Sequence, residues 1–304
     1  MTLASWAELI WAAGADWVED RAPRLGAALA YYTMFSLAPL LVISIRVAGL
    51  IFGEEAARGQ VAHQIQSLVG QEGAQAIEQM LAAAGAPSSG ITGTVTSLFL
   101  LLFGAVAVFG ELQDALNTIW DVPPKPNYSW MDLLRDRLLT FAMILAVAFL
   151  LLVVLIVSTV LSVVMTWIQN WQTVWLAHLI DFGVSFAALT GLFAMSYKVL
   201  PDTQIAWRDV WLGAAVTALL FLCGKFLLAL YLGRGTISSA YGAAGSFVVL
   251  LVWLYYSAQV FLFGAELTHQ FACRFGSGAR PPECAGLASS DRVTMSSHSK
   301  TADQ

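Results

Sequence analysis

Charged and hydrogen-bonding side chains inside long apolar segments are the residues of this 304-residue chain that could do chemistry. Where such a segment crosses a bilayer, a charge at its centre costs roughly 2.5–3.5 kcal/mol, so it is seldom kept facing lipid. Basic side chains there could bind an anionic headgroup, and acidic ones could bind a cation. The candidate substrate-binding residues are Lys225, Arg46, Asp181, Glu111, Glu266 and Gln259.

Known catalytic motifs are missing from the sequence. The histidines, His63, His178, His269 and His298, are scattered and show neither H-x-H nor H-E-x-x-H spacing. We therefore expect no cluster of ligands for metal-dependent RNA hydrolysis. The chain also lacks a G-x-x-x-x-G-K-S/T phosphate loop and the G-x-S-x-G elbow of serine hydrolases. We predict that it is not an enzyme and that it holds no metal and no cofactor.

The composition is that of a helical membrane protein. Hydrophobic residues make up 58% of the chain and charged residues 12%, and the mean hydropathy is +0.71. Soluble globular domains are less apolar and more charged. The apolar runs suit spanning helices of roughly 20 residues and do not alternate as barrel strands do. The net charge of −5 provides no basic face for nucleic acid, so no nucleic-acid partner is expected.

Six segments within residues 27–272 are long and apolar enough to span a membrane. They cover residues 27–52, 91–110, 138–166, 177–197, 210–232 and 245–269. Residues 1–26 contain an amphipathic segment that is predicted to lie in the membrane interface, or equally to pack against the bundle. Residues 54–85 are predicted to form a helical hairpin outside the cytoplasm. Residues 273–304 contain few large apolar side chains and are predicted to be a disordered tail.

Proline and glycine mark two expected points of flexure. Pro39 lies inside the first span, where proline removes a helical hydrogen bond and is expected to kink the helix. Gly242 and Gly245 belong to the glycine-rich turn that precedes the last span. Both points lie beside segments that would have to move during transport.

The distribution of basic residues predicts the orientation, because cytoplasmic loops carry an excess of Lys and Arg. If both termini are cytoplasmic, the outer segments contain only Arg58 and Arg234. The inner segments near the membrane then contain Arg21, Arg24, Lys125, Arg135, Arg137, Lys198, Arg208, Arg274 and Arg280. We therefore predict an all-α, six-span protein with both termini in the cytoplasm.

Most of the candidate binding residues also have structural explanations. Arg46 lies about 9 Å from the outer end of its span, where it could reach the headgroups or pair with Asp181. Glu111 and Glu266 lie near the inner ends of their spans and could pair with basic side chains there. Gln259 could form a hydrogen bond between helices. These alternatives stay open at the level of sequence.

Several blocks, in the same order, resemble the YihY/BrkB family of bacterial inner-membrane proteins, once called ribonuclease BN. The blocks are "GAALAYYTMFSLAPLL" from Gly26, "GELQDALNTIW" from Gly110, "RDRLL" from Arg135, "KVLPD" from Lys198, "RDVWLGA" from Arg208, "GKFLLALYLGR" from Gly224 and "SAYGAAGSFVVLLVWLYYSAQVFLFGAELT" from Ser239. The resemblance covers about residues 20–272 and implies an inner-membrane location and a role in envelope integrity. The family pattern is apolar at Arg46, so this arginine is not expected to serve a shared function.

Three functions are consistent with these features. The first is a transporter or flippase-like protein for an anionic lipid or other amphipathic envelope component, with Lys225 near its phosphate. The second is a cation or proton antiporter with Glu266, Glu111 and Asp181 as carriers. The third is a membrane scaffold that binds envelope proteins through residues 54–85. Membrane lipids are the expected partners in every case.

Overall fold

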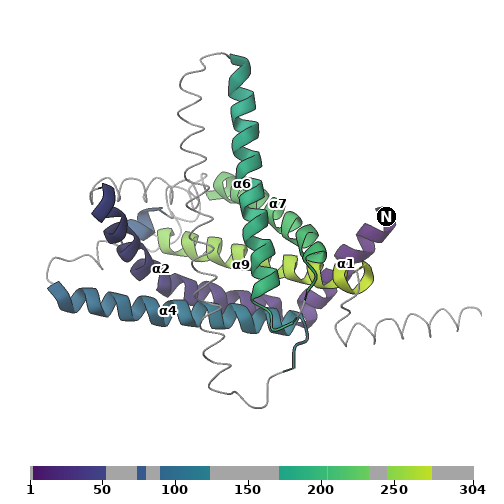
Figure 1. The fold of residues 1–304 in the computed structure, drawn as a ribbon, viewed down its shortest axis with the longest axis horizontal. Coiled ribbons are helices and arrows are strands. Elements are labelled where there is room, and N and C mark those ends of the chain that lie inside the picture. The colour runs from purple at the N-terminus through teal and green to yellow at the C-terminus, as the bar shows by residue number, and fades with distance from the viewer. Residues whose placement is uncertain are drawn as a thin grey trace, which may run out of the picture. The chain divides into compact units, whose positions relative to one another are not determined.

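All elements described in the computed structural model of this chain are α-helices (Figure 1). The structure describes residues 3–52, 74–79, 90–123, 171–203, 205–232 and 245–275. Its helices are α1 (Leu3–Glu19), α2 (Ala22–Phe52), α4 (Gly90–Ile119), α6 (Trp171–Val199), α7 (Trp207–Leu232) and α9 (Gly245–Phe275). The predicted all-α class is confirmed for this part of the chain.

Three of the described helices contain a stretch that is long and apolar enough to cross a membrane. These stretches are Phe182–Val199 in α6, Trp207–Leu227 in α7 and Phe247–Phe275 in α9. They correspond to the last three predicted spans, and α2 and α4 cover the first two. The predicted span 138–166 lies outside the described residues, as do residues 276–304 of the tail and most of the predicted hairpin. The number of six spans and the orientation stay predictions.

The chain divides into two compact units. The first comprises Met1–Asp20, Leu116–Ala218 and Phe263–Gln304, and the second comprises Arg21–Ala115 and Leu219–Leu262. One boundary lies between α1 and α2, and the other three fall inside α4, α7 and α9, so these three helices contribute to both units. Each unit contains an apolar core of its own.

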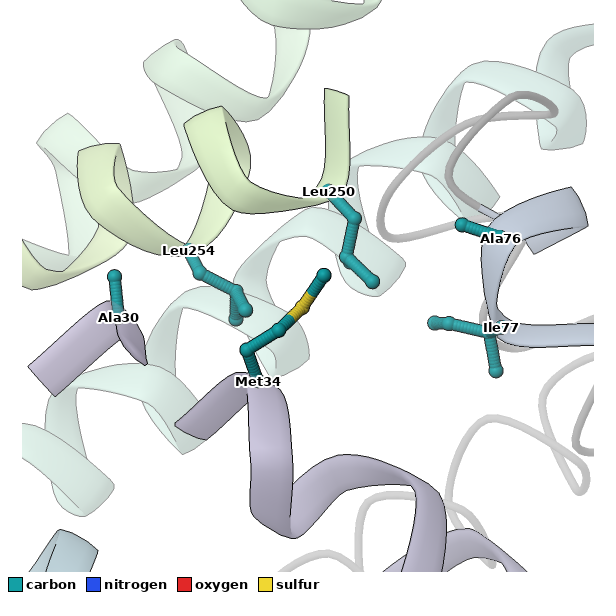
Figure 2. Close-up of a cluster of buried hydrophobic side chains, with 6 residues drawn as sticks. All are labelled: Ala30, Met34, Ala76, Ile77, Leu250 and Leu254. Carbon is teal, nitrogen blue, oxygen red and sulfur yellow. The ribbon is translucent and has the colours of Figure 1, made fainter. Parts of the chain in front are cut away.

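In the second unit, α2 and α9 pack antiparallel. Their core consists of Ala30 and Met34 from α2, Leu250 and Leu254 from α9, and Ala76 and Ile77 from the short helical segment 74–79. In Figure 2 Ala30 lies beside Leu254, and the Met34 side chain extends toward Leu250. One turn before Ala30, the Gln259 side chain lies against the backbone of Gly26. The segment 74–79, which belongs to the predicted hairpin, is thus packed on α2 and α9.

In the first unit, α1 packs on α9 through one apolar face. Leu9 and Ala13 are fully buried against Leu267, because they lie one helical turn apart on α1. Ile10 and Trp11 lie on the other side of α1 and are exposed. This contact agrees with packing on the bundle, one of the two predicted roles of α1. A position in the membrane interface stays a prediction, and the exposed Ile10 and Trp11 would suit it.

Glycine and threonine let α7 and α9 approach closely in the first unit. A Cβ atom on Gly264 would lie 1.7 Å from Thr217 Oγ1, and one on Gly213 would lie 1.8 Å from Thr268 Oγ1. Each threonine hydroxyl donates to a carbonyl of its own helix at 2.7 Å, Thr217 to Gly213 and Thr268 to Gly264. Small residues at such crossings allow backbones to touch in membrane proteins. The crossing fixes the turn of α9 that begins at Gly264.

The C-terminal end of α4 is held by a Schellman motif. The backbone N–H of Val122 donates to the Asn117 carbonyl at 2.9 Å, and that of Asp121 donates to the Thr118 carbonyl at 3.0 Å. Asp121 adopts a φ of 49° at the position that glycine usually occupies. The Asn117 side chain also donates to the Asp202 carboxylate at 3.1 Å. It accepts a hydrogen bond from the backbone N–H of Asp202 at 2.9 Å. These bonds hold Asp121 beyond the last turn of α4.

Candidate functional site

Two carboxylates and an imidazole converge in the first unit. Asp16, Glu266 and His269 each place one potential ligand atom within 4.8 Å of the others. Glu266 and His269 are three residues apart in the sequence E-L-T-H, so they lie on the same face of α9. Asp16 comes from the last turns of α1, which the contacts of Leu9 and Ala13 hold against α9. These three residues are called the carboxylate–histidine cluster below.

Glu266 is the most deeply buried residue of this cluster. Its side chain is fully buried, and among the described residues no N–H or hydroxyl group donates to its carboxylate oxygens; its hydrogen-bonding neighbour is another acid, the Asp20 carboxyl. The charged groups that act on it are themselves acidic, namely Asp20, Asp16 and Asp121. Burying an unpaired charge costs several kcal/mol, and nearby like charges add to that cost. A bound cation would offset both terms.

The other two members of the cluster are supported by neighbouring side chains. The Gln270 amide donates a hydrogen bond to the Asp16 carboxylate. The rings of His269 and Trp120 are 4.9 Å apart between centroids and inclined at 57°. His269 is buried and Asp16 is half-buried, so the cluster reaches from the interior toward the exposed side of α1.

Two further acidic residues, Asp20 and Asp121, add negative charge around the cluster. Asp20 follows α1 directly and is half-buried. Burial raises the pKa of Asp20 to about 6, contact with Glu266 opposes this, and the charges of Asp121 and Asp16 add to it. Because the charges of Asp121 and Asp16 are negative, they favour a cation bound near Asp20.

Among the binding residues predicted from sequence, Glu266 lies in this cluster. Gln259 and Glu111 belong to the second unit and are half-buried; the Gln259 amide donates to the Pro23 carbonyl at 3.5 Å. Lys225 is half-buried on α7 in the same unit. The described contacts therefore do not join these three residues to Glu266.

The remaining predicted residues are described only in part. Arg46 and Asp181 belong to the helices α2 and α6, but their side chains lie outside the described residues. α2 continues as a helix through Pro39. Gly242 also lies outside the described residues, and Gly245 is the buried first residue of α9. Their assigned roles in binding or flexure stay predictions.

The expectation that no His, Asp and Glu cluster exists is wrong. His269 fits neither H-x-H nor H-E-x-x-H spacing, because its carboxylate neighbour Glu266 precedes it by three residues. Asp16 was missed because its partner residues are some 250 positions away in sequence, on another helix. The E-x-x-H spacing of α9 is the one local signal that could have indicated the site, since it places two ligands on one helix face.

Comparison with known proteins assigns the chain to a family. The family model described as virulence factor BrkB matches residues 14–283. Similar relatives are UPF0761 membrane proteins of Verminephrobacter eiseniae (29% identical, covering 88% of this chain and 63% of the relative), Alcanivorax borkumensis (26%, 82% and 57%) and Klebsiella pneumoniae (30%, 58% and 59%). The chain thus spans between half and two thirds of the length of these curated relatives, and no solved structure matches it. Because the family model covers most of its length, this chain belongs to the BrkB family and is a membrane protein.

Proposed function

We propose that this chain is a membrane transporter that carries a cation bound at Glu266. The observation that carries the proposal is the fully buried carboxyl of Glu266 within the apolar stretch Phe247–Phe275, to which no basic side chain of the described residues is paired. Ionisable residues in such stretches commonly mark ion or substrate pathways. The resemblance to bacterial inner-membrane proteins supports a location in that membrane, and the distribution of basic residues supports cytoplasmic termini.

The surroundings of Glu266 favour an ion over a purely structural role. A structural carboxylate in a helix bundle is usually paired with a basic side chain or a hydrogen-bond donor. Glu266 instead adjoins Asp16, Asp20 and Asp121. This arrangement destabilises the fold unless a positive charge enters it.

The proposal is tested by cation uptake into sealed liposomes that contain the full chain. A gradient of Na⁺ or Mn²⁺ is imposed, and entry is followed with an ion-sensitive dye inside the vesicles. Saturable uptake above that of protein-free liposomes supports the proposal. Uptake equal to that of protein-free liposomes, with both ions, contradicts it.

A second candidate function is the movement of an anionic lipid or similar amphipath. The observation that favours it is Lys225, a half-buried cation inside the apolar stretch Trp207–Leu227 of α7. A lysine in such a place is costly unless it faces a partner, and a phosphate headgroup would suit its ammonium. A contribution to envelope integrity would follow from such lipid movement.

Lys225→Met is expected to lower the exchange of a fluorescent anionic phospholipid between leaflets about tenfold or more, because the phosphate loses a charged partner worth about 1.5–3 kcal/mol. The measurement is quenching of the outer-leaflet fluorophore in proteoliposomes. Arg208→Met on the exposed start of the same helix is the control and should leave exchange unchanged. Equal exchange by the wild type and Lys225→Met would remove Lys225 from the mechanism.

A further inference from the structure

We infer that Asp16, Glu266 and His269 form a binding site for a divalent transition metal such as Mn²⁺ or Zn²⁺. The inference rests on the proposed function and specifies the class of cation that Glu266 binds. All three residues belong to one compact unit, so their proximity depends only on contacts within it.

The donor set selects the class of metal. The cluster offers one imidazole nitrogen and two carboxylate oxygens. Na⁺, Mg²⁺ and Ca²⁺ prefer sites made of oxygen, whereas an imidazole suits transition metals such as zinc and iron. Mixed His and carboxylate sets are typical of Mn²⁺, Fe²⁺ and Zn²⁺ sites in helical bundles, where a Glu-x-x-His pair projects from one helix. The pair Glu266 and His269 has this spacing.

The distances suit such an ion. Metal bonds to carboxylate oxygen or imidazole nitrogen are about 2.0–2.2 Å long, so two ligands of one ion lie at most about 4.4 Å apart. The three ligand atoms lie within 4.8 Å of one another, so side-chain shifts of a few tenths of an ångström would bring all three within bonding distance of one ion. Because Asp16 is half-buried, its side of the cluster offers a path for entry.

Two further features point to a ligand. The first is Glu266, which is fully buried and, among the described residues, receives no hydrogen bond from an N–H or hydroxyl group, although it lies within reach of the other two ligands. The second is Gln270, whose amide donates to Asp16 and so orients its carboxylate. Outer hydrogen bonds of this kind position metal ligands in known sites. Asp20 and Asp121 add negative charge around the site without being part of the ligand set.

The test is binding of Mn²⁺ to the detergent-solubilised full chain after removal of metals with a chelator. The electron paramagnetic resonance signal of free Mn²⁺ is followed during titration. We expect about one saturable site per wild-type chain. Asp16→Asn and His269→Gln should each weaken Mn²⁺ binding at least about tenfold. Gln270→Leu should weaken it about 10- to 100-fold. Glu8→Gln, on the exposed side of α1, is the matched control and should bind as the wild type does.

Absence of saturable binding to the folded wild type would overturn the inference, as would unchanged affinity in both Asp16→Asn and Gln270→Leu. Folding of each variant is checked by its elution as a single species in size-exclusion chromatography. If His269→Gln does not fold, the outcome is decided by the other two variants, Asp16→Asn and Gln270→Leu. Metal binding without cation uptake in liposomes would contradict the proposed transport but leave the site intact. Uptake of Na⁺ without Mn²⁺ binding would contradict the site alone.

Discussion

Glu266→Gln is expected to lower cation uptake into proteoliposomes at least about 100-fold, because removing one member of a buried charge pair costs about 3–5 kcal/mol and each 1.4 kcal/mol is about tenfold. Glutamine has nearly the same shape, so packing in this turn of α9 is retained. The loss is therefore expected in the rate and not in the yield of folded protein. Initial uptake rates are compared at equal protein density and the same imposed gradient.

Two controls separate the charge of Glu266 from other effects. Glu8→Gln removes a carboxylate from the exposed side of α1 and should leave uptake unchanged. Glu266→Asp keeps the charge but draws it back by one methylene, so it should retain part of the uptake. If Glu266→Gln transports at the wild-type rate, Glu266 is not the cation ligand.

Gly264→Ala is expected to destabilise the fold by about 3 kcal/mol or more, at the upper end of the range for overpacked cores. The new Cβ would lie 1.7 Å from Thr217 Oγ1 and 2.6 Å from the Tyr197 hydroxyl. These two hydroxyls are themselves hydrogen-bonded at 3.1 Å, so neither can move without breaking that bond. The midpoint of thermal denaturation, measured by loss of the monodisperse chromatographic peak, should fall by several degrees or more.

The matched control for Gly264→Ala is Gly191→Ala on α6, where no atom of the described residues lies within 4 Å of the new Cβ. This substitution should be neutral or stabilise by up to about 1 kcal/mol, because alanine is the better helix former. Adding Thr217→Gly to Gly264→Ala should restore part of the lost stability, since the clashing Thr217 atoms are removed. Equal denaturation midpoints for Gly264→Ala and Gly191→Ala would show that α7 and α9 do not cross as closely as described.

Composition and the length of apolar runs were sufficient to predict the class of fold and several helices. The predicted span 210–232 corresponds to α7 at Trp207–Leu232, and the predicted span 245–269 to α9 at Gly245–Phe275. These helices could be predicted because the thickness of a bilayer sets their apolar length. The face that α1 buries was harder to predict, because the adjacent apolar residues Leu9 and Ile10 differ: Leu9 is buried and Ile10 is exposed.

The candidate site was predicted only at Glu266, because a carboxylate in an apolar span is conspicuous in any sequence. The acidic residues around Glu266 come from the end of α1 and from the residues that follow α4. Periodicity within one helix does not indicate which helices meet. Asp121 in particular is placed by the left-handed cap of α4, a tertiary detail. The glycine and threonine pairs of α7 and α9 show the same limit, since each glycine is explained by a threonine on the other helix.

One measurement tests most directly whether Glu266 binds a cation. It compares the thermal stability of the wild type and of Glu266→Met, each in chelator and in Mn²⁺. In chelator, Glu266→Met should be the more stable protein, because it removes the cost of burying a carboxylate that lacks a counter-ion. Mn²⁺ should raise the denaturation midpoint of the wild type and leave that of Glu266→Met unchanged. A less stable Glu266→Met in chelator, or an equal rise in both proteins with Mn²⁺, would contradict a cation site at Glu266.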